Sequence, residues 1–253
     1  MAFVDILAFW EVTILIGAVL LGYVGVLAYA AMRRNDPAGV KSALRGGAVP
    51  VGAIGAIATL LGVYSEMAWP LPGSYNILFA DVYVLFGVTF LVLAVSMAFT
   101  LKLQYAGLLG LVAGGVTIAY GWNGYSLGMT KEPFQTFLLY GSFGLAGILA
   151  LPSTIVVDYY LAHANGTSAV FGSPVSLARR SPSIQAATRA TQPVVPGTTS
   201  SVPEETELVP KFRLPIYVSV SVVVFVVAVG LAAVAALFFV DSTLPAHLAS
   251  APL

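Results

Sequence analysis

Six long apolar runs constrain the fold of this chain more than any other feature of its sequence. A helix needs roughly 20 apolar residues to cross the hydrocarbon of a bilayer. Runs of about that length lie at Ile6–Met32, Ala43–Tyr64, Ile77–Thr100, Tyr105–Gly121, Phe134–Leu161 and Leu214–Val240. They are continuous, without the period-2 alternation of barrel strands. The sequence therefore predicts an all-α membrane protein with six transmembrane helices.

The composition supports lipid as the solvent. Hydrophobic residues make up 58% of the chain and charged residues only 9%, whereas soluble domains carry about 25% charged residues. The 11 basic and 11 acidic residues cancel, so no net field attracts nucleic acid. The lipid bilayer is the partner that the sequence predicts, and nucleic acid is not.

Basic residues near the helix ends predict the topology, because cytoplasmic connections are enriched in Lys and Arg. The first, third and fifth connections hold ten of the 11 positive charges. Lys131 lies on the other side. Six spans with this bias place both termini outside the cytoplasm and predict a multi-pass protein of the cell membrane.

The chain divides into four predicted parts. Residues 1–164 form a five-helix transmembrane core, and residues 214–240 form a sixth helix. Between them, residues 165–213 are rich in Ser, Thr, Pro and Ala, a composition that cannot bury enough apolar surface to offset the entropy of ordering. We expect a disordered cytoplasmic linker that tethers a separate helix, followed by a short extracytoplasmic tail at 241–253.

Carboxylates and aromatic residues gather at the outer ends of the first three helices. Their candidate members are Glu11, Glu66, Asn76, Asp81 and Tyr83. One interpretation is an outward-facing polar pocket that binds a cation or passes protons, since ionisable residues inside membranes are often functional. The other is an ordinary interfacial belt of aromatic residues and solvated carboxylates. A surface that docks a partner is a third interpretation, and the sequence leaves all three open.

Small residues share one side of the fourth helix, including Gly110 and Gly114 at four-residue spacing. Small side chains let membrane helices approach closely. We expect this face to pack within the core, and such faces also offer a route to contact other membrane subunits.

The side chains needed for common catalytic and cofactor chemistry are scarce. There is no cysteine, and the two histidines, His163 and His247, lie beyond the ends of apolar runs. A haem between helices needs axial histidines inside them, so no haem and no other cofactor is expected. No catalytic or metal-binding residues are predicted. Arg179-Arg180-Ser181 resembles a basophilic phosphorylation site and makes Ser181 a regulatory candidate, or the arginines only anchor the cytoplasmic side.

Several motifs resemble a prokaryotic family of polytopic membrane proteins catalogued as a domain of unknown function, number 981. They are the stretch from Pro72 to Asp81, Tyr120-Gly121 with Gly124-Tyr125, and Phe137 to Tyr140 running into Gly144 and Pro152. The resemblance covers roughly residues 5–162. It implies a small membrane protein without an established activity and supplies no catalytic residues. The linker and sixth helix depart from that pattern.

Three functions follow as hypotheses. The first is a non-enzymatic accessory or scaffolding subunit of a membrane complex, suggested by the small-residue faces and the tethered helix. The second is a small transporter or ion-conducting protein that uses Glu11, Glu66 and Asp81. An intramembrane enzyme is the third, and the scarcity of reactive side chains argues against it.

Overall fold

Six helices form the protein in a computed structural model, which describes residues 6–164 and 216–250 and, in the last helix, the side chains of residues 220–238. The helices are α1 (Ile6–Arg33), α2 (Pro37–Ala68), α3 (Ser74–Ala98), α4 (Gln104–Ser126), α5 (Pro133–Ala164) and α7 (Ile216–Ser250). Each is long and apolar enough to cross a membrane, and no strand occurs within the described ranges. The prediction of an all-α, six-span membrane protein is confirmed.

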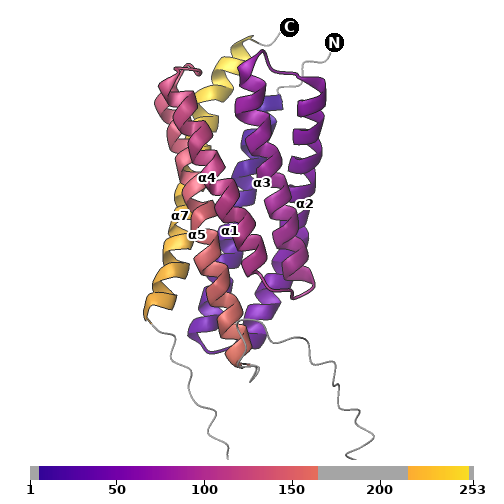
Figure 1. The fold of residues 1–253 in the computed structure, drawn as a ribbon, viewed down its shortest axis with the longest axis vertical. Helices are drawn as coiled ribbons and strands as arrows, with labels where there is room; N and C mark the ends of the chain where they lie inside the picture. The colour runs from indigo at the N-terminus through magenta and orange to yellow at the C-terminus, as the bar shows by residue number, and fades with distance from the viewer. Residues whose placement is uncertain (1–5, 165–215, 251–253) are drawn as a thin grey trace, which may run out of the picture.

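The helices lie side by side along the length of the bundle (Figure 1), and their contacts close a ring. Each of α1 to α5 packs on the next in the chain, and α7 packs on both α5 and α1. Helix α7 therefore lies between the first and fifth helices, although the sequence suggests a helix set apart by a linker. Small residues on α1 explain this position, because Gly22 faces Val229 and Gly25 faces Val226 across the contact. The side chains of Val226 and Val229 fill the space that these glycines leave.

Two helix boundaries differ most from the predicted ones. Helix α7 continues to Ser250, beyond the predicted limit at residue 240 and into the predicted tail. Helix α2 begins at Pro37 rather than Ala43, because Asp36 caps it by accepting a hydrogen bond from the Gly39 N–H at 2.8 Å. The predicted linker at 165–213 lies outside the described residues.

Helices α4 and α5 make a close contact through glycine. An added Cβ on Gly114 would lie 2.4 Å from the Gly144 carbonyl oxygen, and one on Gly147 would lie 2.7 Å from the Gly110 oxygen. The backbones therefore touch where the sequence predicts a smooth face. This face of α4 is used inside the chain.

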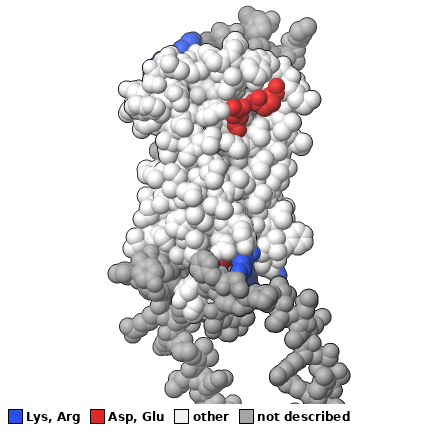
Figure 2. All heavy atoms as spheres, in the orientation of Figure 1, with Lys and Arg blue, Asp and Glu red and all other residues white. Residues whose placement is uncertain are grey.

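Basic and acidic side chains are distributed unevenly between the two ends of the bundle (Figure 2). Among the described residues, the Lys and Arg side chains other than Lys131 belong to the end where α1 finishes and α2 begins. Figure 2 shows acidic side chains gathered near the opposite end of the visible face. This arrangement agrees with the bias from which the topology was predicted, while the orientation in the membrane stays a prediction.

Candidate functional site

A cavity of about 210 Å³ lies inside the ring. Residues of α1, α3, α4, α5 and α7 line it, and α2 contributes Leu44. From Leu7 to Met32, which both line the cavity, α1 rises roughly 37 Å at 1.5 Å per residue. The cavity is therefore elongated along the axis of the bundle.

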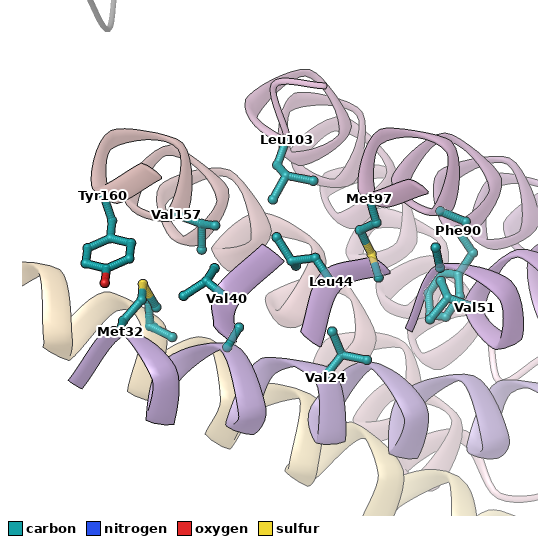
Figure 3. Packing of buried hydrophobic residues seen from close by; sticks show 14 residues of the cluster. Val24, Met32, Val40, Leu44, Val51, Phe90, Met97, Leu103, Val157 and Tyr160 are labelled. Atoms are coloured by element: carbon teal, nitrogen blue, oxygen red, sulfur yellow. The ribbon is translucent and has the colours of Figure 1, made fainter. Parts of the chain in front are cut away.

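The wall of the cavity is almost entirely apolar. The end of the cavity nearest the α1–α2 connection is called the inner end here. It is formed by side chains that belong to the main core cluster, namely Met32, Leu44, Met97, Leu103 and Val157. Figure 3 shows these residues converging from α1, α2, α3, α5 and the start of α4. Helix α2 also contacts α5, and Val40 and Tyr160 join the same cluster. Side chains from opposite sides of the ring thus meet at this end.

Polar groups lie at the opposite end of the same cavity, called the outer end. Trp10, Glu11 and Tyr83 all line it, with exposed fractions of 3%, 6% and 1%. The Trp10 and Tyr83 rings stack with their centroids 5.0 Å apart. Within the described residues, neither the Trp10 Nε1–H nor the Tyr83 hydroxyl has a hydrogen-bond partner. The Thr13 hydroxyl lies beside Tyr83 but donates to the Phe9 carbonyl oxygen at 2.8 Å.

Glu66 and Asp81 form a second group, away from the cavity. The Tyr120 hydroxyl of α4 donates to Asp81 Oδ2 at 2.5 Å, and the Glu66 carboxyl is close enough to interact with Asp81. Neither carboxylate lines the cavity, whereas Glu11 does. The structure therefore divides four of the five candidate pocket residues between two places, Glu66 with Asp81 and Glu11 with Tyr83.

Asn76, the fifth candidate, connects two backbone segments. It is fully buried. Its amide group donates to the Ser65 carbonyl oxygen at 3.1 Å and accepts from the Leu71 N–H at 3.4 Å. Asn76 thereby fixes the end of α2 to the connection that follows it, a structural task that explains its burial.

Hydroxyl groups on α3 bond to their own helix. Thr89 donates to the Leu85 carbonyl oxygen at 2.7 Å and Ser96 to the Val92 oxygen at 2.8 Å. Such bonds are common for Ser and Thr in membrane helices. Because these donors are occupied, the hydroxyls below Asp81 do not form a continuous hydrogen-bonded path in the structure.

Two tertiary contacts were not predicted from the sequence. Asp158 of α5 accepts hydrogen bonds from the backbone N–H groups of Leu103 and Gln104 at 3.0 and 2.9 Å, and so caps the N-terminus of α4. The Tyr140 hydroxyl donates to the Leu78 carbonyl oxygen at 2.8 Å, joining α5 to α3. No local sequence signal identifies either partner, because each pair is more than fifty residues apart.

The remaining candidate residues lie at the end of α5 or outside the described residues. Ser181 lies outside the described residues, as does the side chain of His247. His163 is exposed at the end of α5 and its ring nitrogen Nδ1 lies 3.1 Å from the Tyr159 carbonyl oxygen. The described residues contain no group of three or more His, Asp or Glu side chains that could hold a metal ion.

Comparisons with known proteins give a family but no activity. Neither the curated proteins nor the solved structures contain a match to this chain. The model of one family, described as "Protein of unknown function (DUF981)", matches residues 1–170. That match covers α1 to α5, the part of the chain in which the sequence motifs lie, and it leaves α7 outside. The chain therefore belongs to the DUF981 family of proteins of unknown function.

Proposed function

We propose that this multi-pass membrane protein is a non-enzymatic protein of the cell membrane that holds one lipid-like hydrocarbon chain inside its helix ring. The observation that carries the proposal is the long cavity of about 210 Å³ with apolar walls. An apolar cavity of about 150 Å³ stays dry and takes up apolar molecules. Water is thus a poor occupant here, and the surrounding bilayer supplies hydrocarbon.

The free-energy cost of an empty cavity also favours a bound hydrocarbon chain. Cavities in protein interiors cost about 24 cal/mol per Å³, so this one would cost about 5 kcal/mol if it stayed empty. A single chain that fills it restores the missing dispersion contacts. The length of the cavity along α1 suits a chain rather than a compact ligand.

A cavity-filling variant tests the proposal. Ala113 lines the cavity on α4, whereas Ala53 is exposed on the outer surface of α2. We expect hexadecane to raise the melting temperature of the delipidated wild-type protein by mass action, and Ala113→Leu to reduce this response. Ala53→Leu is the matched control and should respond like the wild type. Equal responses of all three proteins, or none, would refute the proposal; if Ala113→Leu is not folded, Ala28→Leu, at another position on the wall, replaces it.

The accessory or scaffolding role is the second candidate. Two features that suggested it, the glycine face of α4 and the sixth helix, are engaged within the chain. However, Gly115 of α4 and Gly230 of α7 are exposed, and a Cβ on either would meet no described atom within 4 Å. A helix of another subunit could approach closely there. Co-purification in mild detergent tests this role, and loss of the partner in Gly115→Leu or Gly230→Leu would support it.

A transporter that uses carboxylates is less well supported by the geometry. Glu11 lies on the cavity wall, and Glu66 and Asp81 do not. Ion flux in proteoliposomes, compared between the wild type and Asp81→Asn, tests this alternative directly.

A further inference from the structure

The polar end of the cavity indicates which kind of chain it accepts. Burying a polar group without a hydrogen bond costs free energy. Trp10 and Tyr83 each bury such a group at the cavity wall. The surrounding residues do not relieve this cost, so a bound molecule that brings a hydrogen-bond acceptor would gain from both groups.

The donors restrict the chemistry of that molecule. The indole Nε1–H of Trp10 only donates, and the Tyr83 hydroxyl can donate or accept. An oxygen acceptor such as an alcohol or a carbonyl satisfies both. A hydrocarbon without a head group satisfies neither.

The charge of the wall restricts it further. Among the residues that the structure describes, those that line the cavity include Glu11 and no Lys, Arg or His. A phosphate or carboxylate head would therefore be buried beside an acidic side chain without a cation to pair with it, which is costly. A neutral head avoids this penalty.

We propose that the cavity selects a neutral single-chain amphiphile whose alcohol or carbonyl oxygen accepts hydrogen bonds from Trp10 Nε1 and the Tyr83 hydroxyl. Its hydrocarbon chain extends from there toward the inner end at Met32 and Val157. This inference rests on the proposed function and adds the orientation and head-group class of the occupant.

Three probes of equal chain length test the selection. They are 1-hexadecanol, hexadecanoic acid at alkaline pH and hexadecane, each with a diazirine near one chain end, and saturable photolabelling of the full-length protein in nanodiscs gives their apparent Kd values. We expect hexadecanol to bind more tightly than the other two. Hexadecane lacks the hydrogen bonds, and hexadecanoate lacks a counter-charge.

Two substitutions isolate the head-group contacts. Tyr83→Phe keeps the aromatic ring and removes only the hydroxyl, so it should weaken hexadecanol binding about three- to tenfold and leave hexadecane binding unchanged. Trp10→Phe removes the indole donor together with part of the ring, so it should weaken hexadecanol binding more than it weakens hexadecane binding. Trp122→Phe and Tyr64→Phe, at exposed positions, are the matched controls. In the empty protein, Tyr83→Phe should not lower the melting temperature, because it removes an unpaired buried polar atom and keeps the ring.

The outcomes separate this inference from the proposed function. Saturable binding of all three probes with equal affinity, or hexadecanol binding that neither substitution weakens, overturns the head-group selection and leaves the hydrocarbon-holding function intact. A lower melting temperature of empty Tyr83→Phe also overturns it, because it would assign that hydroxyl a structural role. Failure of every probe to saturate overturns the proposed function itself.

Discussion

The backbone contact between α4 and α5 gives a sharp test of the packing. In Gly114→Ala, the new Cβ would lie 2.4 Å from the Gly144 carbonyl oxygen and 2.8 Å from the Ile148 nitrogen. Both obstacles are backbone atoms, so no side chain can rotate away and the helices must separate. Overpacking of this kind costs about 1–3 kcal/mol.

Gly115→Ala is the matched control, because a Cβ there meets nothing within 4 Å. Both substitutions gain helix propensity, about 1 kcal/mol for Ala over Gly, so the difference between the two variants isolates the steric cost. We expect Gly114→Ala to be about 1–3 kcal/mol less stable than Gly115→Ala, and thus to melt at least about 2 °C lower.

The assay is the loss of the monodisperse peak in size-exclusion chromatography after heating in mild detergent. The reciprocal pair on α5 is Gly147→Ala, with a Cβ 2.7 Å from the Gly110 oxygen, and Gly141→Ala, with nothing within 4 Å. It should show the same order. Equal melting temperatures within both pairs would refute the close packing of α4 on α5.

Three further predictions follow from single contacts and from the charge distribution. Asp158→Ala should destabilise the protein by about 1–2 kcal/mol, as expected when a helix loses its N-terminal cap. Asp158→Asn should destabilise it less, because the amide retains one acceptor oxygen. Thermal melting in detergent measures both effects, and an unchanged melting temperature would contradict the capping role. Tyr140→Phe should cost about 1 kcal/mol through loss of the hydrogen bond to the Leu78 carbonyl, while Tyr105→Phe, at an exposed position, should melt like the wild type; equal effects would argue against the bond. In the naturally cysteine-free chain, Ser126→Cys should react with an impermeant thiol reagent in intact cells and Asn35→Cys should not, and the opposite pattern would invert the predicted topology.

The number and place of the helices could be predicted because each apolar run is continuous and long, a property of the local sequence alone. The contacts between helices could not be predicted in the same way. The composition of residues 165–213 suggested that α7 is a separate helix, whereas its position depends on Gly22 and Gly25 of α1, some two hundred residues earlier. Asp158 likewise reads as an ordinary interfacial carboxylate until α4 is placed beside it.

The arrangement of the candidate pocket could not be predicted for the same reason. Glu11, Glu66 and Asp81 lie at a similar depth, but the direction that each faces is set by the neighbouring helices. One signal for the cavity was present in α1, where Leu7, Glu11, Ile14, Ala18, Leu21, Gly25, Ala28 and Met32 follow the three- and four-residue spacing of one helix face and all line the cavity. A carboxylate on an otherwise apolar face distinguishes Glu11 from the other two.

The central claim is that one neutral chain occupies the ring, and native mass spectrometry of the gently extracted protein tests it most directly. The wild type should retain a single adduct with the mass of a neutral long-chain molecule, and organic extraction should release an alcohol or carbonyl compound. Ala113→Leu should lose this adduct while Ala53→Leu keeps it. A wild-type spectrum at the bare polypeptide mass, or identical adducts on the wild type and Ala113→Leu, would contradict the account.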